Sequence, residues 1–437
     1  MKKFYIETLG CPKNEVDSKR MKLAMIKEGF LPSENPEEAD FILINSCSFI
    51  QEAQEETIDT IFSAIDIKEQ KNKNAKIGVI GCFTERFHKH IEKEIPEIDF
   101  LVGTNRYEEV PVLLKEKFRL NGTLTKKSRK TIPLQEGQKP YSHFRIARGC
   151  SRSCAFCILP TIRGSLNPYS FSQIQNEWEK EIQLRGGNIP KEVILISQDT
   201  ISQGVENLRE IVQFFSAIPE VQWIRFQYLF PDKRVLKLLD LWNEFDKLVP
   251  YLDIPFQHAH PAVLRRMNRP DQPDLFFEII EKARGIRPDM EIRTSFIVGF
   301  PDETEEEFSA LKTFIEQAEI DKLALFRYSH EDGTPAAKQY VDNIDDHTKI
   351  RRMNELNSFF LEHRRKKREG LMGKIEKMML ESITETEWDF RRAQDAPEID
   401  EIVHVSPVKG INVKEGEFYP VRIESPLEID WEGTWVM

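Results

Sequence analysis

The chain has 437 residues, of which 40% are hydrophobic and 31% charged, and its formal net charge is −11. This composition predicts a globular protein of about three domains, and no apolar run reaches the roughly 18 residues of a membrane span. The first residues, 1–7, lack the apolar core of a secretory signal, so we expect a cytoplasmic protein without membrane contact. Six cysteines in so long a chain exclude a disulfide scaffold.

The first 110 residues or so alternate short apolar runs with helical periodicity, which predicts a parallel α/β sheet. Three strands are expected, at residues 4–9, 40–45 and 76–80. One cysteine follows each strand: Cys11, Cys47 and Cys82. Because the carboxyl ends of parallel strands share one edge, the three thiols should meet there, as ligands of an iron-sulfur cluster with one open iron. The alternative is that each is a small buried residue at a strand end.

From about residue 108 to 141 the periodicity weakens into a polar stretch, which predicts a linker. The central region then repeats short strands with helices between them, which predicts a parallel, incomplete (β/α)6 barrel. The expected strands are 144–147, 192–196, 223–226, 251–254, 291–298 and 322–328, and the clearest helices are 170–184, 275–284 and 305–316. The chemistry of such a barrel lies at the carboxyl ends of its strands.

A second group of cysteines follows the first of these strands in a C-x3-C-x2-C run: Cys150, Cys154 and Cys157. Structural zinc sites have four protein ligands, and iron-sulfur clusters normally take four cysteines. A missing fourth ligand therefore indicates a cluster with one iron open to substrate or cofactor. The spacing resembles that of the radical S-adenosylmethionine (radical-SAM) superfamily, and the resemblance implies reductive cleavage of S-adenosylmethionine at that iron.

A long charged helix is expected at residues 345–369, and it ends in the basic run 364–368. These cations suit either the negative end of the helix dipole or an RNA contact. Short alternating strands from residue 373 onward predict a small all-β barrel. Between Lys374 and Met437, seven basic residues stand against fifteen acidic ones, a balance of −8. Such a field repels a phosphate backbone and attracts a basic protein.

Several strings together resemble the methylthiotransferase family over nearly the whole chain. They are Gly10-Cys11-Pro12-Lys13-Asn14, Gly81-Cys82-Phe83-Thr84-Glu85-Arg86, Gln198-Asp199-Thr200, 251–258, 295–301, 328–336 and 395–400. The resemblance implies an N-terminal methylthiotransferase domain at 1–115, a linker at 116–140, a radical-SAM domain at 141–371 and a TRAM domain at 372–437. It also implies two 4Fe-4S clusters and S-adenosyl-L-methionine as cofactors, with the six cysteines as metal ligands.

The Gly10 to Asn14 string is similar to the family branch that modifies the small-subunit ribosomal protein S-twelve. The implied product carries a methylthio group on the β-carbon of an aspartate, an unactivated position that a general base cannot usefully deprotonate, so that a radical route is needed. The implied partners are S-twelve, a reductant protein and a ribosome or rRNA contact. The alternatives are a tRNA adenosine methylthiotransferase and, from another class, a non-catalytic, metal-containing binder of the ribosome. The acidic tail favours the basic ribosomal protein over tRNA.

Five residues near strand ends or cluster ligands are candidate contacts of the cofactor: Phe156, Gln198, Gln257, Ser295 and Gly299. Phe156 would shield iron and contact the adenine, unless it only packs. The glutamines and the serine would donate or accept hydrogen bonds, unless they only cap strands. Gly299 would allow close approach of the backbone, although a turn would also select glycine. No catalytic side chain is singled out, and His258 and His260 are expected to be structural.

Overall fold

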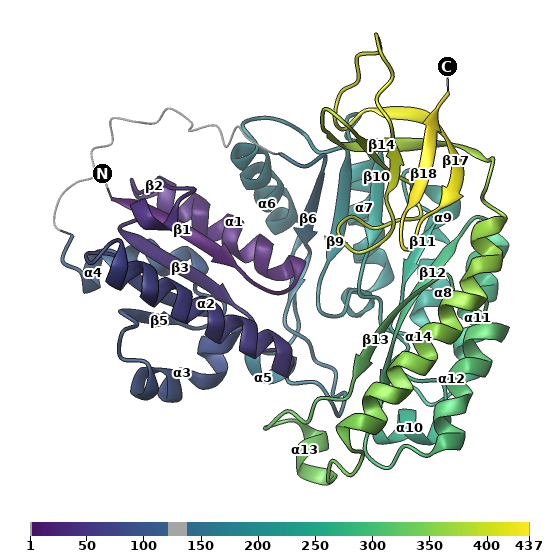
Figure 1. The fold of residues 1–437 in the computed structure, drawn as a ribbon, viewed down its shortest axis with the longest axis horizontal. Helices are drawn as coiled ribbons and strands as arrows, with labels where there is room; N and C mark the ends of the chain where they lie inside the picture. The colour runs from purple at the N-terminus through teal and green to yellow at the C-terminus, as the bar shows by residue number, and fades with distance from the viewer. Residues whose placement is uncertain (1, 121–137, 437) are drawn as a thin grey trace.

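The computed structural model describes residues 2–120 and 138–436, and it contains three folded units (Figure 1). The expected linker at 116–140 lies for the most part outside the described residues. One element in the region of weakened periodicity was not predicted, the helix α4 (Val110–Lys117). None of the helices in the described ranges combines the length and the hydropathy of a membrane span.

The N-terminal unit is a parallel five-stranded sheet in the order β2-β1-β3-β4-β5, as the sequence predicts for this class. Its strands are β1 (Lys3–Thr8), β2 (Leu31–Pro32), β3 (Phe41–Ser46), β4 (Lys76–Gly81) and β5 (Phe100–Val102). Helices cover both faces, because alternate strand residues point to opposite sides. Apolar residues of α2 (Gln51–Gln70) and α3 (Cys82–Glu94) pack on one face. The other face packs against α1 (Pro12–Lys27) and α4.

The central unit has the six expected strands, divided into two parallel three-stranded sheets, β6-β9-β10 and β11-β12-β13. The strands are β6 (Tyr141–Arg145), β9 (Glu192–Ile196), β10 (Trp223–Phe226), β11 (Tyr251–Asp253), β12 (Glu291–Val298) and β13 (Lys322–Arg327). The amide of Leu229 donates to Asp253 O at 3.0 Å, so β10 and β11 lie beside each other at their carboxyl ends. The six strands therefore form the incomplete barrel. Its largest apolar cluster lies between the strands and the outer helices.

The first expected strand of this barrel is broken at Ile146, because the chain leaves β9 there and forms β7 (Ala147–Arg148), which pairs with β8 (Asn167–Pro168). The helices of the unit are α5 (Leu159–Arg163), α6 (Phe171–Leu184), α7 (Val205–Ser216), α8 (Arg234–Leu238), α9 (Leu241–Glu244), α10 (Pro261–Arg266), α11 (Pro273–Ile286), α12 (Glu305–Gln317), α13 (Pro335–Gln339) and α14 (Asp346–Glu369). Capping boxes begin α6 and α12, at Ser170 and Thr304.

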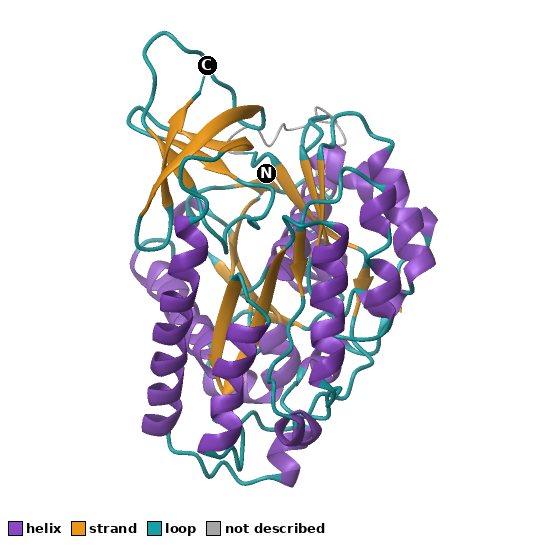
Figure 2. Cartoon of the chain, turned by 90° about the vertical axis from the view of Figure 1, so that its right-hand side faces the viewer, coloured by secondary structure: helices purple, strands orange, loops and turns teal. Residues whose placement is uncertain are grey.

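The C-terminal unit is a closed five-stranded barrel in the order β14-β15-β16-β18-β17. Its strands are β14 (Ile375–Ile383), β15 (Trp388–Arg391), β16 (Val403–Val405), β17 (Phe418–Pro426) and β18 (Trp431–Trp435). Figures 1 and 2 show it beyond one end of the central strands, next to the end of α14. It contacts residues that begin strands, such as Glu192, Glu291 and Lys322. The small barrel therefore covers the amino ends of the central strands.

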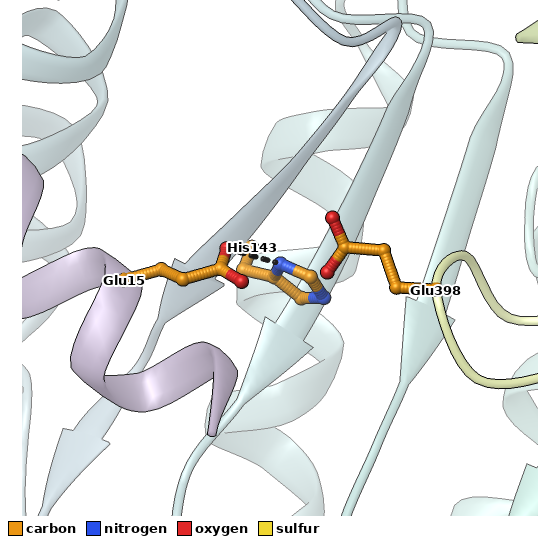
Figure 3. A group of neighbouring side chains, drawn as sticks. All are labelled: Glu15, His143 and Glu398. Carbon is orange, nitrogen blue, oxygen red and sulfur yellow. Dashed lines mark ion pairs between the residues drawn. The ribbon is translucent and has the colours of Figure 1, made fainter. Parts of the chain in front are cut away.

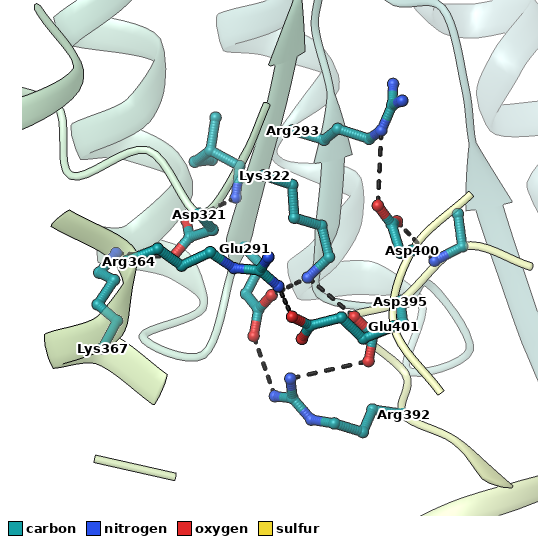
Figure 4. A network of polar contacts seen from close by, with 12 residues as sticks. Glu291, Arg293, Asp321, Lys322, Arg364, Lys367, Arg392, Asp395, Asp400 and Glu401 are labelled. Atoms are coloured by element: carbon teal, nitrogen blue, oxygen red, sulfur yellow. Dashed lines mark hydrogen bonds and ion pairs between the residues drawn. The ribbon is translucent and has the colours of Figure 1, made fainter. Parts of the chain in front are cut away.

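A buried network of charges joins the C-terminal barrel to the central one (Figure 4). Lys322 pairs with Asp395 at 2.9 Å and also with Glu291, and Arg392 reaches Glu291 at 3.0 Å. The 395–400 string, quoted above for its family resemblance, thus lies in the interface. Asp395 and Asp400 pair with Lys322 and Arg293 of the central barrel, whereas Glu398 is exposed.

The basic run at the end of α14 serves the same interface. Arg364 pairs with Glu401, and Lys367 pairs with Asp321 at 2.6 Å. Arg368 donates to Ile429 O at 2.9 Å and lies over the Trp431 ring, 4.3 Å from its centroid. Neither expected use of these cations, a solvated helix end or an RNA contact, describes these three residues. Arg364 and Arg368 attach the helix to the small barrel, and Lys367 attaches it to the central one.

Candidate functional site

The cysteines of the C-x3-C-x2-C run lie on one loop that follows β7, at the carboxyl end of the central strands. The Cys150 amide donates to Gly164 O at 3.0 Å, and the Ala155 amide donates to Met267 O at 2.8 Å, so both ends of the loop are tied to the barrel. The Arg152 amide donates to Cys150 Sγ at 3.4 Å, and Arg269 donates to Cys154 Sγ at 3.5 Å. Donors of this kind would also stabilise negative sulfur ligands.

The three N-terminal cysteines follow β1, β3 and β4, and the structure brings them together at one edge of the sheet. At Gly10, whose φ is +84°, an added Cβ would lie 2.7 Å from Sγ of Cys47, so only glycine fits beside this thiol. Cys47 interacts electrostatically with both Cys11 and Cys82. This convergence is what the parallel sheet predicted.

The short helix α5 connects the two groups of cysteines. It begins two residues after Cys157, and its residue Ile162 packs against Cys82. At its end, Arg163 donates to Asp17 at 2.6 Å and to Asn14 at 2.5 Å. The two groups of thiols therefore lie on either side of one helical turn.

Asp17 is the buried centre of the contact between the N-terminal unit and the central barrel. It is fully buried and also pairs with Arg145, the last residue of β6. Burial acts to raise the pKa of Asp17, but the two arginines hold that pKa well below its ordinary value. Sequence reasoning did not assign these residues. The sequence signal for this contact was Arg145, a charged residue within the otherwise apolar strand sequence 144–147.

The thiols fit an iron-sulfur cluster better than a single metal ion. Neither trio belongs to the groups of described residues whose ligand atoms all lie within 4.8 Å of one another. One tetrahedral zinc ion, with Zn–S near 2.3 Å, would need sulfurs closer than that, whereas a cluster of several irons spaces its ligands more widely. Burial raises the pKa of Cys47 and of Cys157 to about 12. These groups become thiolates when a metal replaces the proton.

Two of the five candidate cofactor contacts touch each other. Gln257 donates through Nε2 to Ser295 Oγ at 3.1 Å, and its backbone has a φ of +74°. Phe156 packs on two apolar clusters of the central barrel. At Gly299 an added Cβ would lie 2.4 Å from Cγ of Lys349, which is a packing reason for glycine at this place. Their contacts with a cofactor stay predictions.

Unpartnered polar atoms gather at the carboxyl ends of the central strands. Gln198 Oε1 follows β9, and both amide atoms of Gln227 follow β10; all are buried and have no partner within the described structure. Buried polar groups are nearly always hydrogen-bonded, so these amides are suited to a ligand with donors and acceptors. Gln227 was not predicted as a site residue. S-adenosyl-L-methionine carries both kinds of group.

Lys13, at the start of α1, reaches the same end of the barrel. Its Nζ lies 3.1 Å from the centroid of the Tyr228 ring, and the Tyr228 amide donates to Asp253 at 3.0 Å. The side chain is 8% exposed. Burial lowers the pKa of Lys13 to about 8, so most of the amine is protonated at neutral pH.

The expected structural role of the histidines agrees with their contacts. His258 Nε2 lies 2.9 Å from Glu303, and the His260 amide donates to His258 Nδ1 at 3.0 Å. His260 in turn accepts a hydrogen bond from the Ala262 amide at the start of α10. Both imidazoles thus fix the loop between β11 and α10.

A third polar group, formed by Glu15, His143 and Glu398, lies where the three units meet (Figure 3). Its side-chain types would suit a divalent metal ion. The Tyr141 hydroxyl donates to Glu398 at 2.7 Å, and Lys139 pairs with the same carboxylate. Because Glu398 already has these partners, we assign the group to contact between the units.

Comparison with known proteins covers all three units. Residues 3–103 match the family described as Uncharacterized protein family UPF0004, residues 144–315 match the Radical SAM superfamily, and residues 372–436 match the TRAM domain. The fold resembles that of TsrM, a radical S-adenosylmethionine methyltransferase from Kitasatospora setae, with a TM-score of 0.52 at 11% identity over 75% of this chain and 73% of that one. A likeness at this identity concerns the fold alone.

The fold of OxsB, a cobalamin-dependent S-adenosylmethionine radical enzyme, is also similar, with a TM-score of 0.51 at 13% identity. The alignment covers 83% of this chain but only 56% of OxsB. Two relatives are similar along their whole length, and both are named ribosomal protein uS12 methylthiotransferase RimO. The one from Leptospira biflexa is 39% identical, over 100% of this chain and 97% of the relative. The one from Sulfurihydrogenibium is 35% identical, over 96% of each.

Proposed function

The chain belongs to the family of ribosomal protein uS12 methylthiotransferases, and from this premise we propose that it adds a methylthio group to the β-carbon of an aspartate of uS12. It is a radical-SAM enzyme with a C-terminal TRAM domain. The similarity to relatives of this one name along the whole chain carries the proposal. It favours uS12 over tRNA and over a non-catalytic binder.

The acidic tail also supports this choice. Two of its fifteen acidic residues and two of its seven basic residues are buried. The acidic excess of this unit is therefore kept by its exposed and partly exposed side chains. The proposed substrate, uS12, is the one that the sequence analysis expected. The proposal rests on the similarity to the relatives and not on the charge of the tail.

We propose two 4Fe-4S clusters, one on Cys150, Cys154 and Cys157 and one on Cys11, Cys47 and Cys82. When bound, the first cluster with S-adenosyl-L-methionine would supply a radical route to an unactivated C–H bond, and the second would hold the sulfur to be transferred. The protein's part is to fix both groups of ligands around α5, to keep water out by burial, and to present Gln198 and Gln227 to the cofactor. Phe156, Gln257, Ser295 and Gly299 are proposed cofactor contacts.

The remaining parts of the proposal concern the cell. A cytoplasmic location suits oxygen-sensitive clusters and a ribosomal substrate. Reductive chemistry requires an electron donor, which we propose to be a separate reductant protein. A contact with the ribosome or rRNA is proposed for the assembled substrate.

The substrate is tested by mass spectrometry of uS12 and of tRNA hydrolysates from cells with and without the chain. The mass of a methylthio group should disappear from uS12 alone when the chain is absent. Loss from tRNA alone would refute the assignment.

The clusters are tested on protein purified without oxygen. It should hold about eight iron atoms if both clusters have four irons. Cys154→Ala and Cys82→Ala should each lower the iron content by about half. Only Cys154→Ala should abolish cleavage of S-adenosyl-L-methionine. A colourless protein with stoichiometric zinc would favour the non-catalytic binder.

A further inference from the structure

The described part of the chain contains three buried lysines, and one of them differs from the others. Lys322 pairs with Asp395 at 2.9 Å, and Lys349 pairs with Asp342 at 2.6 Å. Lys13 is equally buried, but within residues 2–120 and 138–436 it forms no ion pair. Buried ammonium groups are rarely left without a carboxylate, because the cost of removing a charge from water is high.

The carboxylates near Lys13 are already bound by other cations. Asp17 is shared by Arg145 and Arg163, and Asp253 pairs with Arg293 at 3.3 Å while it accepts from the Tyr228 amide. Cys11 and Asp253 attract the Lys13 ammonium, and Arg145 and Arg163 repel it. Within the described residues, none of these groups forms an ion pair with Lys13.

The position of Lys13 is that of a ligand contact. Lys13 is the second residue of α1 and lies two residues after Cys11. Its ammonium lies over the ring of Tyr228, which follows β10. The carboxyl ends of barrel strands are where substrates bind. The Tyr228 ring supports the ammonium from one side, as cation–π contacts do, and leaves its other hydrogens free for an acceptor.

We propose that Lys13 binds the side-chain carboxylate of the substrate aspartate and so selects aspartate at this site. The inference rests on the proposed function, since it presupposes an aspartate of uS12 as substrate. A carboxylate would complete the ion pair that Lys13 lacks. A neutral adenine offers no such charge, so the same residue would discriminate against tRNA. Lys13 is thus assigned to binding and specificity, not to the chemical step.

The test measures binding of uS12, and of uS12 with the target aspartate changed to asparagine, to the anaerobically reconstituted enzyme. Fluorescence anisotropy without reductant gives affinity without turnover. The wild-type enzyme should bind the aspartate form about 10- to 100-fold more tightly, since a hydrogen-bonded charge contributes about 1.5–3 kcal/mol. Lys13→Met should bind both forms alike, and Lys13→Arg should restore part of the preference. Lys27→Met, which changes an exposed lysine of the same helix, should behave as wild type.

Two further measurements separate the competing roles. If Lys13→Met keeps the preference for aspartate, the proposal is wrong. A loss of iron would instead assign Lys13 to the cluster on Cys11, and weaker binding of S-adenosyl-L-methionine would assign it to the cofactor carboxylate; either result overturns the proposal. If wild-type enzyme leaves uS12 unmodified in the mass spectra, the proposed function fails whatever Lys13 does.

Discussion

Each end of the central barrel contains a buried lysine, and the two lysines differ in whether the protein supplies an ion-pair partner. At the amino ends of the strands, Lys322, Glu291 and Arg392 pair with one another and with the C-terminal barrel. At the carboxyl ends, Lys13 lies buried without an ion pair, and Gln198 Oε1 and both amide atoms of Gln227 have no hydrogen-bond partner in the described structure. The difference indicates that the first end was shaped for stability and the second for ligands.

Buried ion pairs also lie at the carboxyl ends, such as Asp17 with Arg145 and Glu303 with Arg352, and the loss of Asp17 should have the largest effect. Asp17→Asn leaves Arg145 and Arg163 buried without a full negative partner. Removing one partner from a buried ion pair costs about 3–5 kcal/mol, and with two arginines affected we expect the upper part of this range. Urea unfolding followed by circular dichroism measures it. A change under about 1 kcal/mol would show that the arginines have other partners.

Two of the three buried lysines in the described residues, Lys322 and Lys13, give a direct comparison of the two ends. Lys322→Met should destabilise the protein by about 3 kcal/mol, because Glu291 and Asp395 lose their shared cation while Arg392 remains nearby. Lys13→Met removes a cation without an ion pair, so its unfolding midpoint should stay at the wild-type value or rise. Equal destabilisation by both substitutions in urea would contradict the contrast between the ends.

Some of this contrast could be predicted from the sequence and some could not. The strands 192–196 and 291–298 were predicted to the residue, because turn residues lie close to both ends of each. The meeting of Cys11, Cys47 and Cys82 followed from the parallel sheet. The partners of Asp17 lie 128 and 146 residues away in the sequence, and Glu291, a partner of Lys322, lies 31 residues away; no local pattern encodes such pairings. The helix α4 was missed because its eight residues are too short for a clear period.

Acid should separate the C-terminal barrel from the central one. Burial acts to raise the pKa of Glu291, but Lys322 and Arg392 lower it to about 2, below its ordinary 4.5. Its contribution to stability is complete above about pH 4.5 and is lost as the pH falls through 2. Burial raises the pKa of Asp400, so protonation there offsets part of the loss. Fluorescence of Trp223, which packs on Phe418, should report the separation between pH 4.5 and 2. A signal that stays constant over this range would contradict it.

Substitution of two arginines of α14, Arg368 and Arg365, should change the stability least. Arg368 donates to carbonyl groups of the small barrel and covers Trp431, so Arg368→Ala should lower the stability of that barrel by about 1–2 kcal/mol. Among residues 2–120 and 138–436, Arg365 pairs only with Glu362 and Glu369, on the exposed surface of its own helix. Arg365→Ala should leave the melting temperature unchanged within error. Scanning calorimetry of the two variants measures both, and a matching loss would mean that the basic run acts as a whole.

The five residues of α5 fix the number of residues that can lie between Cys157 and Gly164. Each residue of an α-helix turns the chain by about 100°, so one inserted residue would rotate Arg163 away from Asp17 and Asn14. The same insertion would carry Ile162 off Cys82. Insertions and deletions between Cys157 and Gly164 should therefore be far less tolerated than conservative substitutions there, since they would change the spacing of the two cysteine groups itself.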